Sequence, residues 1–483
     1  MSFVQKAFQA SVWLAAFQFV TQLLSWSVTI LIARLLLPED YGLVAMATLL
    51  TSYVEIVSEL GIGSAIVQRS SVTNEDLNGV FWMGIGTGIG FAGLGVLLAF
   101  VTAWVFDDQR IVPLTQFASL QFVLGGLLVV PHSLLMREVR FKEIGIIHLC
   151  AVGLGSVTSL GLAWWGWGVW ALLGGYLMQR VVLVVLSYYV SGWRPGGKCN
   201  WANVRPFLNF GLKVTGSGTA YYVFQRADQF VVGRLFTAQV LGYYSMALQL
   251  ASLPTEKVVV LIRKIAYPVF AHYQDDPLKC RLMFLHATQY MMLMVAPLLV
   301  GGAIFGEELI LVSLGNQWEP VIPLFRVLCV AQLFMALATL TGMVQTALGV
   351  PQRVLAFNSI LAVLMPLSVL IAAQAGFEFV VVPWVTIFPI VCMVWIRSVL
   401  NTLGIDPLSY LKQFVAPLLA CLVMIVGVLS SQAVFGAVFP SFRELPLRVA
   451  QEIALGGLLY IGYLILFDRS IVKRLWALHR GDS

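Results

Sequence analysis

The stretch Ile32-Ala-Arg-Leu-Leu-Leu-Pro-Glu-Asp-Tyr-Gly-Leu-Val-Ala-Met-Ala47 has a related copy two hundred positions later, Val232-Gly-Arg-Leu-Phe-Thr-Ala-Gln-Val-Leu-Gly-Tyr-Tyr-Ser-Met-Ala247. In each copy, one long apolar segment ends, the chain turns within a few residues, and another apolar segment begins. A motif repeated at such a point predicts a duplicated bundle of helices. Without a gap, the copies share Arg34/Arg234, Leu35/Leu235, Gly42/Gly242, Met46/Met246 and Ala47/Ala247.

The composition is that of a membrane protein. Of 483 residues, 59% are hydrophobic and 11% are charged, and the mean hydropathy is +0.89, whereas a soluble domain has about 25% charged residues. Apolar runs of about 17–25 residues are long enough to cross a bilayer as helices. We predict an all-α polytopic membrane protein with about fourteen transmembrane helices, near 11–36, 41–67, 79–106, 112–136, 144–165, 168–191, 206–235, 239–266, 282–304, 321–348, 354–374, 378–400, 411–436 and 446–468.

The segment 191–206 marks the predicted break between two halves, because it holds Pro, Gly and basic residues and no apolar run. We expect an N-terminal six-helix bundle in 1–195 and a pseudo-symmetric second bundle in 206–400. Residues 411–483 are expected to add two transmembrane helices and a cytoplasmic tail. Bundles duplicated in this way are common among transporters.

Lys and Arg are distributed unequally between alternate loops. With the N-terminus in the cytoplasm, the loops on that side hold nineteen of the 29 Lys and Arg residues, the opposite loops hold five, and five lie within spans. Because cytoplasmic loops carry the excess of basic residues in membrane proteins, we expect both termini to be cytoplasmic. The net charge of +6 reflects this asymmetry, so we expect no nucleic-acid partner.

Residues that carry enzyme or cofactor chemistry are sparse. The six cysteines form no C-x-x-C pair, so we expect free thiols and neither a metal nor a cofactor. His132, His148 and His286 stand singly, and the outer loops are short. A polysaccharide polymerase or ligase would need acid, base or metal groups at the outer face, so we expect that the protein is not an enzyme.

Polar residues at spacings of three and four form stripes along four predicted spans, and such spacing places them on one face of a helix. Lipid offers such a face no hydrogen-bond partner, so the stripes either pair between helices or line a cavity. Their presence in matching spans of both halves favours a shared polar cavity. The candidate cavity residues are Gln18, Gln22 and Ser25 in the first span and Tyr222, Gln225 and Gln229 in the seventh.

Charged residues within the spans are costly and are usually functional. Arg226 flanks the polar stripe of its span, and Arg180 lies near the middle of the sixth span. Guanidinium groups bind phosphate bidentately and stay charged, so both are candidates for holding an anion; a structural ion pair between helices is the alternative for each. The candidates for ion coupling are Glu55, Glu59 and Asp228, and the two glutamates would otherwise form salt bridges with basic residues.

The third span is rich in glycine. Gly88-Ile-Gly-Phe-Ala-Gly93 fits a dinucleotide-binding pattern, but that motif needs a soluble βαβ unit. The pairs Gly84/Gly88 and Gly86/Gly90 instead predict close packing of this helix against a neighbour.

Several motifs together resemble a known family. The signature Ala33-Arg-Leu-Leu-Leu-Pro-Glu-Asp-Tyr-Gly-Leu-Val-Ala-Met-Ala47 resembles the first loop of bacterial polysaccharide flippases. These proteins form the colanic-acid-exporter-like branch of the multidrug/oligosaccharidyl-lipid/polysaccharide exporter superfamily. The resemblance extends to Glu59-Leu-Gly-Ile-Gly63, Gln68-Arg69, Phe81-Trp82, Arg140-Phe-Lys142 and Gly168-Val-Trp-Ala-Leu172.

The resemblance implies two six-helix bundles around a cavity that opens alternately to the two faces of a bacterial inner membrane. It implies an undecaprenyl-diphosphate-linked oligosaccharide as the substrate, turned from the cytoplasmic to the periplasmic leaflet for export of a polysaccharide. The expected partners are this substrate, membrane lipid, and polysaccharide polymerase and export machinery, with the protein itself a monomer. The alternative is a cation-coupled multidrug or metabolite antiporter, for which a cavity rich in carboxylates would be expected.

Overall fold

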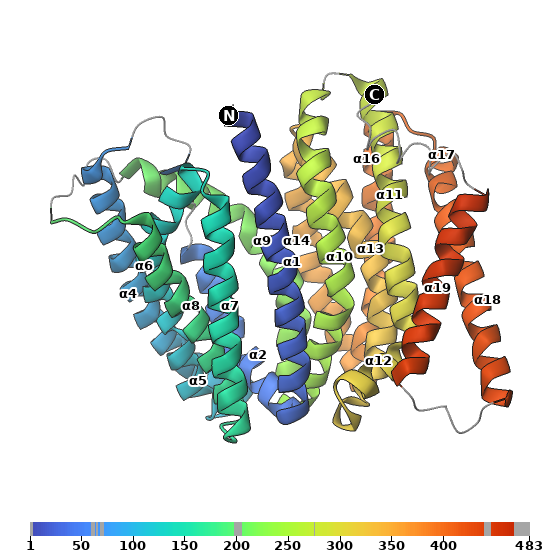
Figure 1. Ribbon diagram of the computed structural model, residues 1–483, viewed down its shortest axis with the longest axis horizontal. Helices are drawn as coiled ribbons and strands as arrows, with labels where there is room; N and C mark the ends of the chain where they lie inside the picture. The colour runs from blue at the N-terminus through green and yellow to red at the C-terminus, as the bar shows by residue number, and fades with distance from the viewer. Residues whose placement is uncertain are drawn as a thin grey trace. The chain divides into compact units, whose positions relative to one another are not determined.

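The computed structural model describes residues 3–58, 63, 66–67, 72–197, 205–274, 276–438 and 446–467. In these ranges all regular structure is helical and no β-strand occurs, which confirms the predicted all-α class (Figure 1). The chain divides into two compact units, Met1–Ser245 and Met246–Ser483. This division falls within a helix, α10, whereas the sequence predicts a break at 191–206, and the predicted domain limits stay a prediction.

The first unit holds the helices up to the start of α10. Their bounds are α1 (Phe3–Leu35), α2 (Pro38–Ser58), α4 (Asn74–Phe106), α5 (Ile111–Ala118), α6 (Leu120–Arg137), α7 (Phe141–Trp164), α8 (Val169–Ser191), α9 (Arg205–Leu235) and α10 (Ala238–His272). The second unit holds the rest of α10 and the helices that follow. These are α11 (Pro277–Ile304), α12 (Gly306–Ser313), η2 (Asn316–Trp318), α13 (Val321–Ala347), α14 (Pro351–Ala373), η3 (Phe377–Val381), α15 (Val382–Val385), α16 (Ile387–Leu403), α17 (Pro407–Leu411), η4 (Lys412–Phe414), α18 (Val415–Val438) and α19 (Pro446–Phe467).

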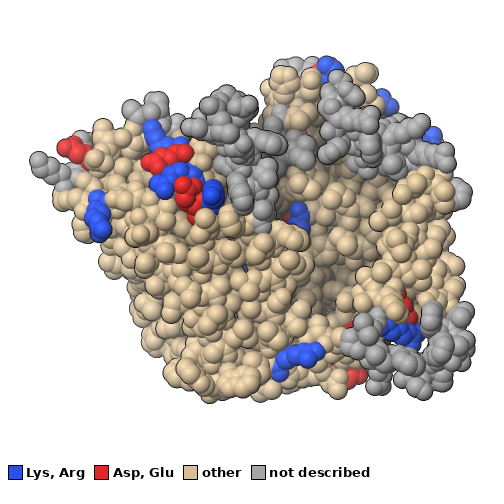
Figure 2. All heavy atoms as spheres, viewed as in Figure 1, with Lys and Arg blue, Asp and Glu red and all other residues tan. Residues whose placement is uncertain are grey.

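The protein is a multi-pass membrane protein. Within the described residues, twelve helical segments are long and apolar enough to cross a membrane. The long helices α2 and α9 are not among these twelve, so the predicted number of fourteen is approximate. Large apolar side chains such as Leu97 and Val185 lie on the outside of the helices. On the face shown in Figure 2, charged residues gather toward the helix ends and the band between them is almost uncharged, as a lipid-facing surface requires.

The repeated motif has the same structure in both copies. The first copy ends α1 at Leu35 and begins α2 at Pro38, and the second ends α9 at Leu235 and begins α10 at Ala238. The two copies also touch each other through their shared glycine. A methyl group added at Gly42 would strike the carbonyl oxygen of Ala238, and one added at Gly242 would strike the carbonyl oxygen of Pro38. This reciprocal contact, as in a two-fold interface, explains physically why both copies need glycine here.

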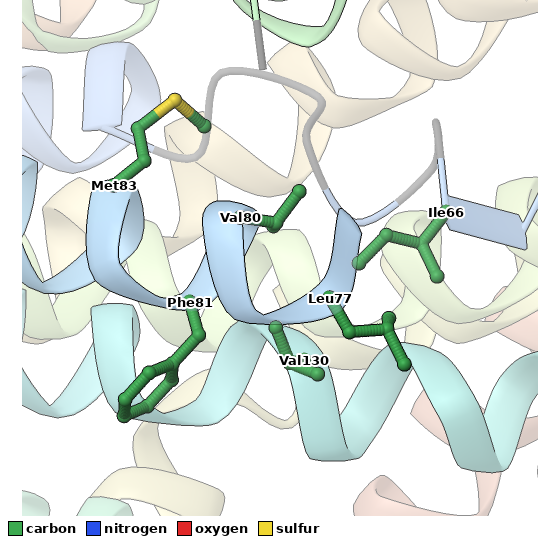
Figure 3. Close-up of a cluster of buried hydrophobic side chains, with 6 residues drawn as sticks. All are labelled: Ile66, Leu77, Val80, Phe81, Met83 and Val130. Carbon is green, nitrogen blue, oxygen red and sulfur yellow. The ribbon is translucent and has the colours of Figure 1, made fainter. Parts of the chain in front are cut away.

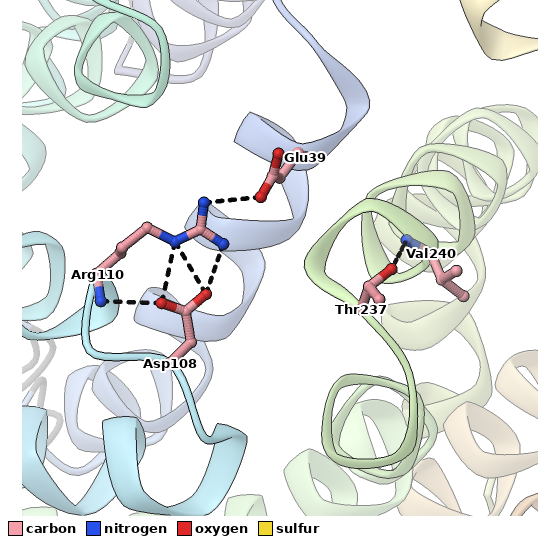
Figure 4. A network of polar contacts seen from close by, with 5 residues as sticks. All are labelled: Glu39, Asp108, Arg110, Thr237 and Val240. Atoms are coloured by element: carbon pink, nitrogen blue, oxygen red, sulfur yellow. Dashed lines mark hydrogen bonds and ion pairs between the residues drawn. The ribbon is translucent and has the colours of Figure 1, made fainter.

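An ion-pair network holds the start of α2 in place (Figure 4). The Arg110 guanidinium lies 2.7 Å from the Glu39 carboxylate and 2.7 Å from that of Asp108. Its hydrogen bonds hold the pKa of Asp108 below its usual range, so this carboxylate is charged at neutral pH. In the second copy, the backbone N–H of Val240 donates instead to the hydroxyl of Thr237, at 3.4 Å.

Close packing joins α4 to α6. A methyl group at Gly84 would lie 3.1 Å from the carbonyl oxygen of Gly126, so the predicted close approach at Gly84 and Gly88 is confirmed. At Gly86 and Gly90 it would meet nothing within 4 Å, so the prediction for that pair is wrong. Around the start of α4, a buried apolar cluster secures the contact with α6 (Figure 3). Its members are Ile66, Leu77, Val80, Phe81, Met83 and Val130.

The segment that follows α8 is bound to the start of α4. The indole N–H of Trp82 donates to the carbonyl oxygen of Gly196 at 3.0 Å, and the N–H of Gly196 donates to the Asn78 side chain at 2.9 Å. The ring of Trp193 packs edge-on against Phe81, with centroids 5.4 Å apart. The Phe81-Trp82 motif therefore ties this connecting segment to the first unit.

Candidate functional site

The candidate site is built around α2, the helix that begins in the repeated motif. Within the first unit, α2 packs against α4, α5, α8 and α9. Its contact with α5 includes a hydrogen bond from the Thr115 hydroxyl to the carbonyl oxygen of Ala47, at 3.2 Å. Polar side chains of α2 therefore face partners from several helices in the interior of this unit.

Arg180 and Glu55 form an ion pair between α8 and α2. The guanidinium also donates two hydrogen bonds, of 2.8 and 3.2 Å, to the hydroxyl of Tyr176, one turn earlier on α8. That hydroxyl in turn donates to the side-chain oxygen of Gln121 on α6, at 2.6 Å. Both charged side chains are about a quarter exposed, at 26% and 27%. The structure thus pairs one anion-binding candidate with one ion-coupling candidate.

A tyrosine-lined contact joins α2 to α9. The Tyr222 hydroxyl donates to the carbonyl oxygen of Leu49, and its ring lies 5.6 Å from that of Tyr53, centroid to centroid. The Tyr53 and Thr219 hydroxyls lie 3.4 Å apart. Both helices thus contribute hydroxyl groups and aromatic faces. Such a combination is suited to polar molecules that also carry apolar surface.

Arg226 lies one turn beyond Tyr222 on α9, and its side chain is exposed. One guanidinium nitrogen donates to the side-chain oxygen of Gln229, at 2.8 Å. The Tyr222 hydroxyl is within electrostatic range of both Arg226 and Glu55. Through Tyr222, Arg226 is therefore associated with the same part of α2 that carries Glu55, the partner of Arg180.

Asp228 lies apart from this set, because its side chain is buried with only 1% exposed. Its carboxylate accepts hydrogen bonds from the Tyr244 hydroxyl and from the backbone N–H of Gln229. Tyr244 belongs to α10 and is fully buried. The carboxylate therefore holds the end of α9 to the start of α10, and its predicted role in ion coupling stays a prediction.

The remaining candidates are less closely associated with Arg180 and Arg226. Gln225 donates to the Tyr221 hydroxyl at 2.8 Å, on the exposed side of α9. Gln18, Gln22 and Ser25 lie on α1, which packs mainly against α7, and their place in a cavity stays a prediction. Glu59 lies outside the described residues.

Several residues of the site were not predicted from the sequence. Tyr176 could have been found, because it lies four residues before Arg180 and such pairs meet on a helix surface. Nothing in the sequence joins Tyr53 or Gln121 to the site. The structure also brings His132 of α6 and His148 of α7 together, with ring centroids 6.0 Å apart, although the sequence suggested that they stand singly.

The arrangement is suited to reversible binding of an anion. Guanidinium groups supply positive charge and several donors, and tyrosine hydroxyls and amides supply further hydrogen bonds to a polar group. No group of three or more His, Cys, Asp or Glu that could hold a metal ion occurs in the part of the chain that the structure describes. Cys150, Cys280, Cys329, Cys392 and Cys421 are free.

Replacing Arg180 by glutamine is expected to lower the free energy of unfolding by about 1–3 kcal/mol, because Glu55 is left partly buried without its counter-charge. The double variant Arg180→Gln/Glu55→Gln should recover part of this loss. Thermal unfolding in detergent measures both. The exposed pair Arg110–Glu39 is the control, and Arg110→Gln should cost less than about 1 kcal/mol. Equal losses in the single and double variants would show that the two charges do not stabilise each other.

The sequence is similar to that of known polysaccharide biosynthesis proteins. A family model described as "Polysaccharide biosynthesis protein" matches residues 31–323, more than half of the chain. The chain is 28% identical to the lipopolysaccharide biosynthesis protein WzxC of Escherichia coli over 64% of each protein, so the match spans just under two thirds of that relative. It is 26% identical to the succinoglycan biosynthesis transport protein ExoT of Rhizobium meliloti, over 93% of this chain and 91% of ExoT.

Two solved structures share the fold. The lipid II flippase MurJ, in an inward closed conformation, matches with a TM-score of 0.73 over 95% of this chain and all of MurJ, at 12% sequence identity. An inward-facing multidrug transporter of the MATE family matches with a TM-score of 0.59 over 82% of this chain and 99% of that chain, at 14% identity. At these identities the likeness shows the fold alone.

Proposed function

Since the chain belongs to the polysaccharide biosynthesis protein family, we propose that it moves a lipid-linked oligosaccharide across a membrane. The substrate we infer is an undecaprenyl-diphosphate-linked repeat unit, carried from the cytoplasmic to the periplasmic leaflet of a bacterial inner membrane by alternating access. Both termini are then cytoplasmic, and the product supplies a polysaccharide polymerase and export machinery. The sequence similarity to a transport protein for succinoglycan supports this proposal, and the fold is one that a lipid II flippase also has.

The observation that carries the proposal is Arg226, an exposed guanidinium on a helix whose neighbouring side chains are polar. A diphosphate in a low-dielectric setting needs positive charge and hydrogen-bond donors. Gln229 orients the Arg226 guanidinium through one hydrogen bond, and the remaining nitrogen donors of a guanidinium suffice for bidentate binding of a phosphate. Tyr222, one turn before Arg226 on α9, and its neighbour Tyr53 supply the hydroxyls that we propose for the first sugar residues.

Arg180 adds a second cation whose availability depends on Glu55. In the structure the two are paired, so an incoming phosphate competes with the Glu55 carboxylate for the guanidinium. Protonation of Glu55 would release Arg180 to the phosphate, and loss of the proton would restore the ion pair. This exchange is our proposal for the step that couples substrate binding to ion movement.

The test of the proposed function is the sidedness of the lipid-linked oligosaccharide in cells that lack the protein. Glycans accessible from the periplasm are labelled and compared with those in cells in which the protein is restored. Accumulation on the cytoplasmic leaflet, relieved by restoration, is the expected result, and mass spectrometry of the pool then identifies the sugar. An unchanged distribution would exclude the proposed flippase function.

The alternative is a cation-coupled antiporter on the same scaffold, and the buried carboxylate of Asp228 is the observation in its favour. Replacing Asp228 by asparagine keeps the size of the side chain and removes its charge. If the antiporter function holds, drug or metabolite efflux should depend on Asp228 while the lipid-linked pool stays unchanged. If the flippase function holds, there is no drug or metabolite efflux, and the Asp228→Asn change can alter only the lipid-linked pool.

A further inference from the structure

We propose that His132 and His148 form a proton-dependent binding element for the diphosphate, next to Arg180. This inference rests on the proposed function and adds a second place where the same substrate binds. The two imidazole rings face each other at right angles, with centroids 6.0 Å apart and an interplanar angle of 81°. Both side chains are partly exposed, so neither is sealed in an apolar core.

The packing of three helices brings the pair close to the candidate site. His148 lies on the face of α7 that contacts α8, between the buried residues Ile144 and Ala151. Arg180 of α8 is close enough to His148 for their charges to interact, and His148 interacts in the same way with His132. The two imidazoles and the guanidinium thus follow one another through the interior of the first unit.

The pair lies at a different depth from Arg180. At 1.5 Å per residue, His132 is about 8 Å from the end of α6 at Arg137, and His148 is about 10 Å from the start of α7 at Phe141. Arg180 is about 16 Å from the end of α8 at Ser191. All three helix ends belong to the predicted cytoplasmic face. A diphosphate that enters from this face would therefore meet the histidines before it reaches Arg180.

Imidazole chemistry fits this position. A phosphate bound beside the two rings would favour their protonated forms, because an opposite charge within a few ångströms stabilises a cation. Each imidazolium adds one positive charge and N–H donors that bind phosphate oxygens. When the diphosphate moves on to Arg180, the histidines can return their protons. The pair therefore gives the entry step a dependence on pH that two arginines alone would not.

The effects of other titratable or charged groups near the pair must be distinguished from the effect of the two histidines. Arg180 and its hydrogen-bond partner Tyr176 lie together on α8. Glu55 of α2 is the serious competitor, because its protonation would also free Arg180 at low pH. Arg137 and Arg140 lie at the end of α6 and the start of α7, and Glu143 lies 3.3 Å from Arg140 in an ion pair.

The experiment measures binding of a soluble farnesyl-diphospho-sugar to the purified full-length protein in detergent between pH 5.5 and 8. Each phosphorus of this probe carries one ester bond and the shared anhydride bond, which leaves one strongly acidic group on each, so the charge of the probe is constant over that range. We expect the affinity of the wild-type protein to fall about tenfold or more as the pH rises across this window. In His132→Gln and His148→Gln, tested separately and together in the Glu55→Gln background, the pH dependence should be reduced and then lost.

Two controls make the result specific. His286→Gln changes a partly exposed histidine of the second unit that packs near Tyr290, and it should keep the wild-type pH dependence. Glu55→Gln removes the exchange proposed for Glu55, and the part of the pH dependence that remains in this variant is the part we assign to the histidines. A pH dependence that survives both histidine changes and disappears in Glu55→Gln would assign the proton to Glu55 and overturn the inference.

The outcomes also separate this inference from the proposed function. If the wild-type protein binds the probe equally at every pH, the proposed histidine element is excluded, whereas the proposed flippase function is not. A wild-type protein that binds no diphosphate at any pH would remove both. Thermal unfolding of each variant confirms that the histidine changes leave the protein folded.

Discussion

Replacing Arg226 by alanine is expected to reduce transport of the lipid-linked oligosaccharide by roughly 10- to 150-fold, while the protein still inserts into the membrane. Charged hydrogen bonds contribute about 1.5–3 kcal/mol each, which sets this range. The side chain is exposed and its one described hydrogen bond is to Gln229 on the same helix, so its loss should barely affect folding. The measurement is the rate at which labelled substrate becomes accessible on the far leaflet of reconstituted vesicles.

Two further variants sharpen this test. Arg226→Lys keeps the charge but loses the planar pair of donors, so it should fall between the wild type and alanine. Arg353→Ala is the matched control, because Arg353 is also exposed and donates a single hydrogen bond, of 2.7 Å, to the Thr402 hydroxyl. It belongs to the second unit and is not one of the candidate site residues, so this variant should transport normally. Wild-type transport in Arg226→Ala would exclude Arg226 from the site.

Replacing Gly42 or Gly242 by alanine is the second change with a large expected effect. Either methyl group would strike a backbone carbonyl of the opposite copy of the motif, and backbone cannot move aside as a flexible side chain can. Overpacking of this kind costs about 1–3 kcal/mol. We expect both variants to unfold at lower temperature and to lose transport, since the start of α2 can no longer rest against the start of α10.

Gly90→Ala supplies the control within the same protein. Gly90 also lies within a helix, but an added methyl group there meets nothing within 4 Å. Because alanine favours helix over glycine by about 1 kcal/mol, this variant should be as stable as the wild type or slightly more stable. Thermal unfolding that is lowered equally at positions 42, 242 and 90 would show that the reciprocal contact is not the cause.

Much of the fold could be predicted because its causes are local. Apolar runs long enough to cross a bilayer become helices, since lipid leaves backbone groups no other partners. The turn before Pro38 and its copy before Ala238 occur where these runs stop. The stripe on α9 also indicated Tyr222, Arg226 and Gln229, because residues three and four apart share a helix face.

Only the tertiary structure decided which faces meet. Glu55 and Arg180 are 125 residues apart, and nothing in either span indicates that the other holds its ion-pair partner. His132 and His148 seemed isolated because they belong to different helices, and Gly42 gave no sign that it rests on Ala238. A helix that is apolar on nearly every side carries little information about its rotation. Its orientation is settled by packing against its neighbours, and the pairing of Glu55 with Arg180 follows from that packing.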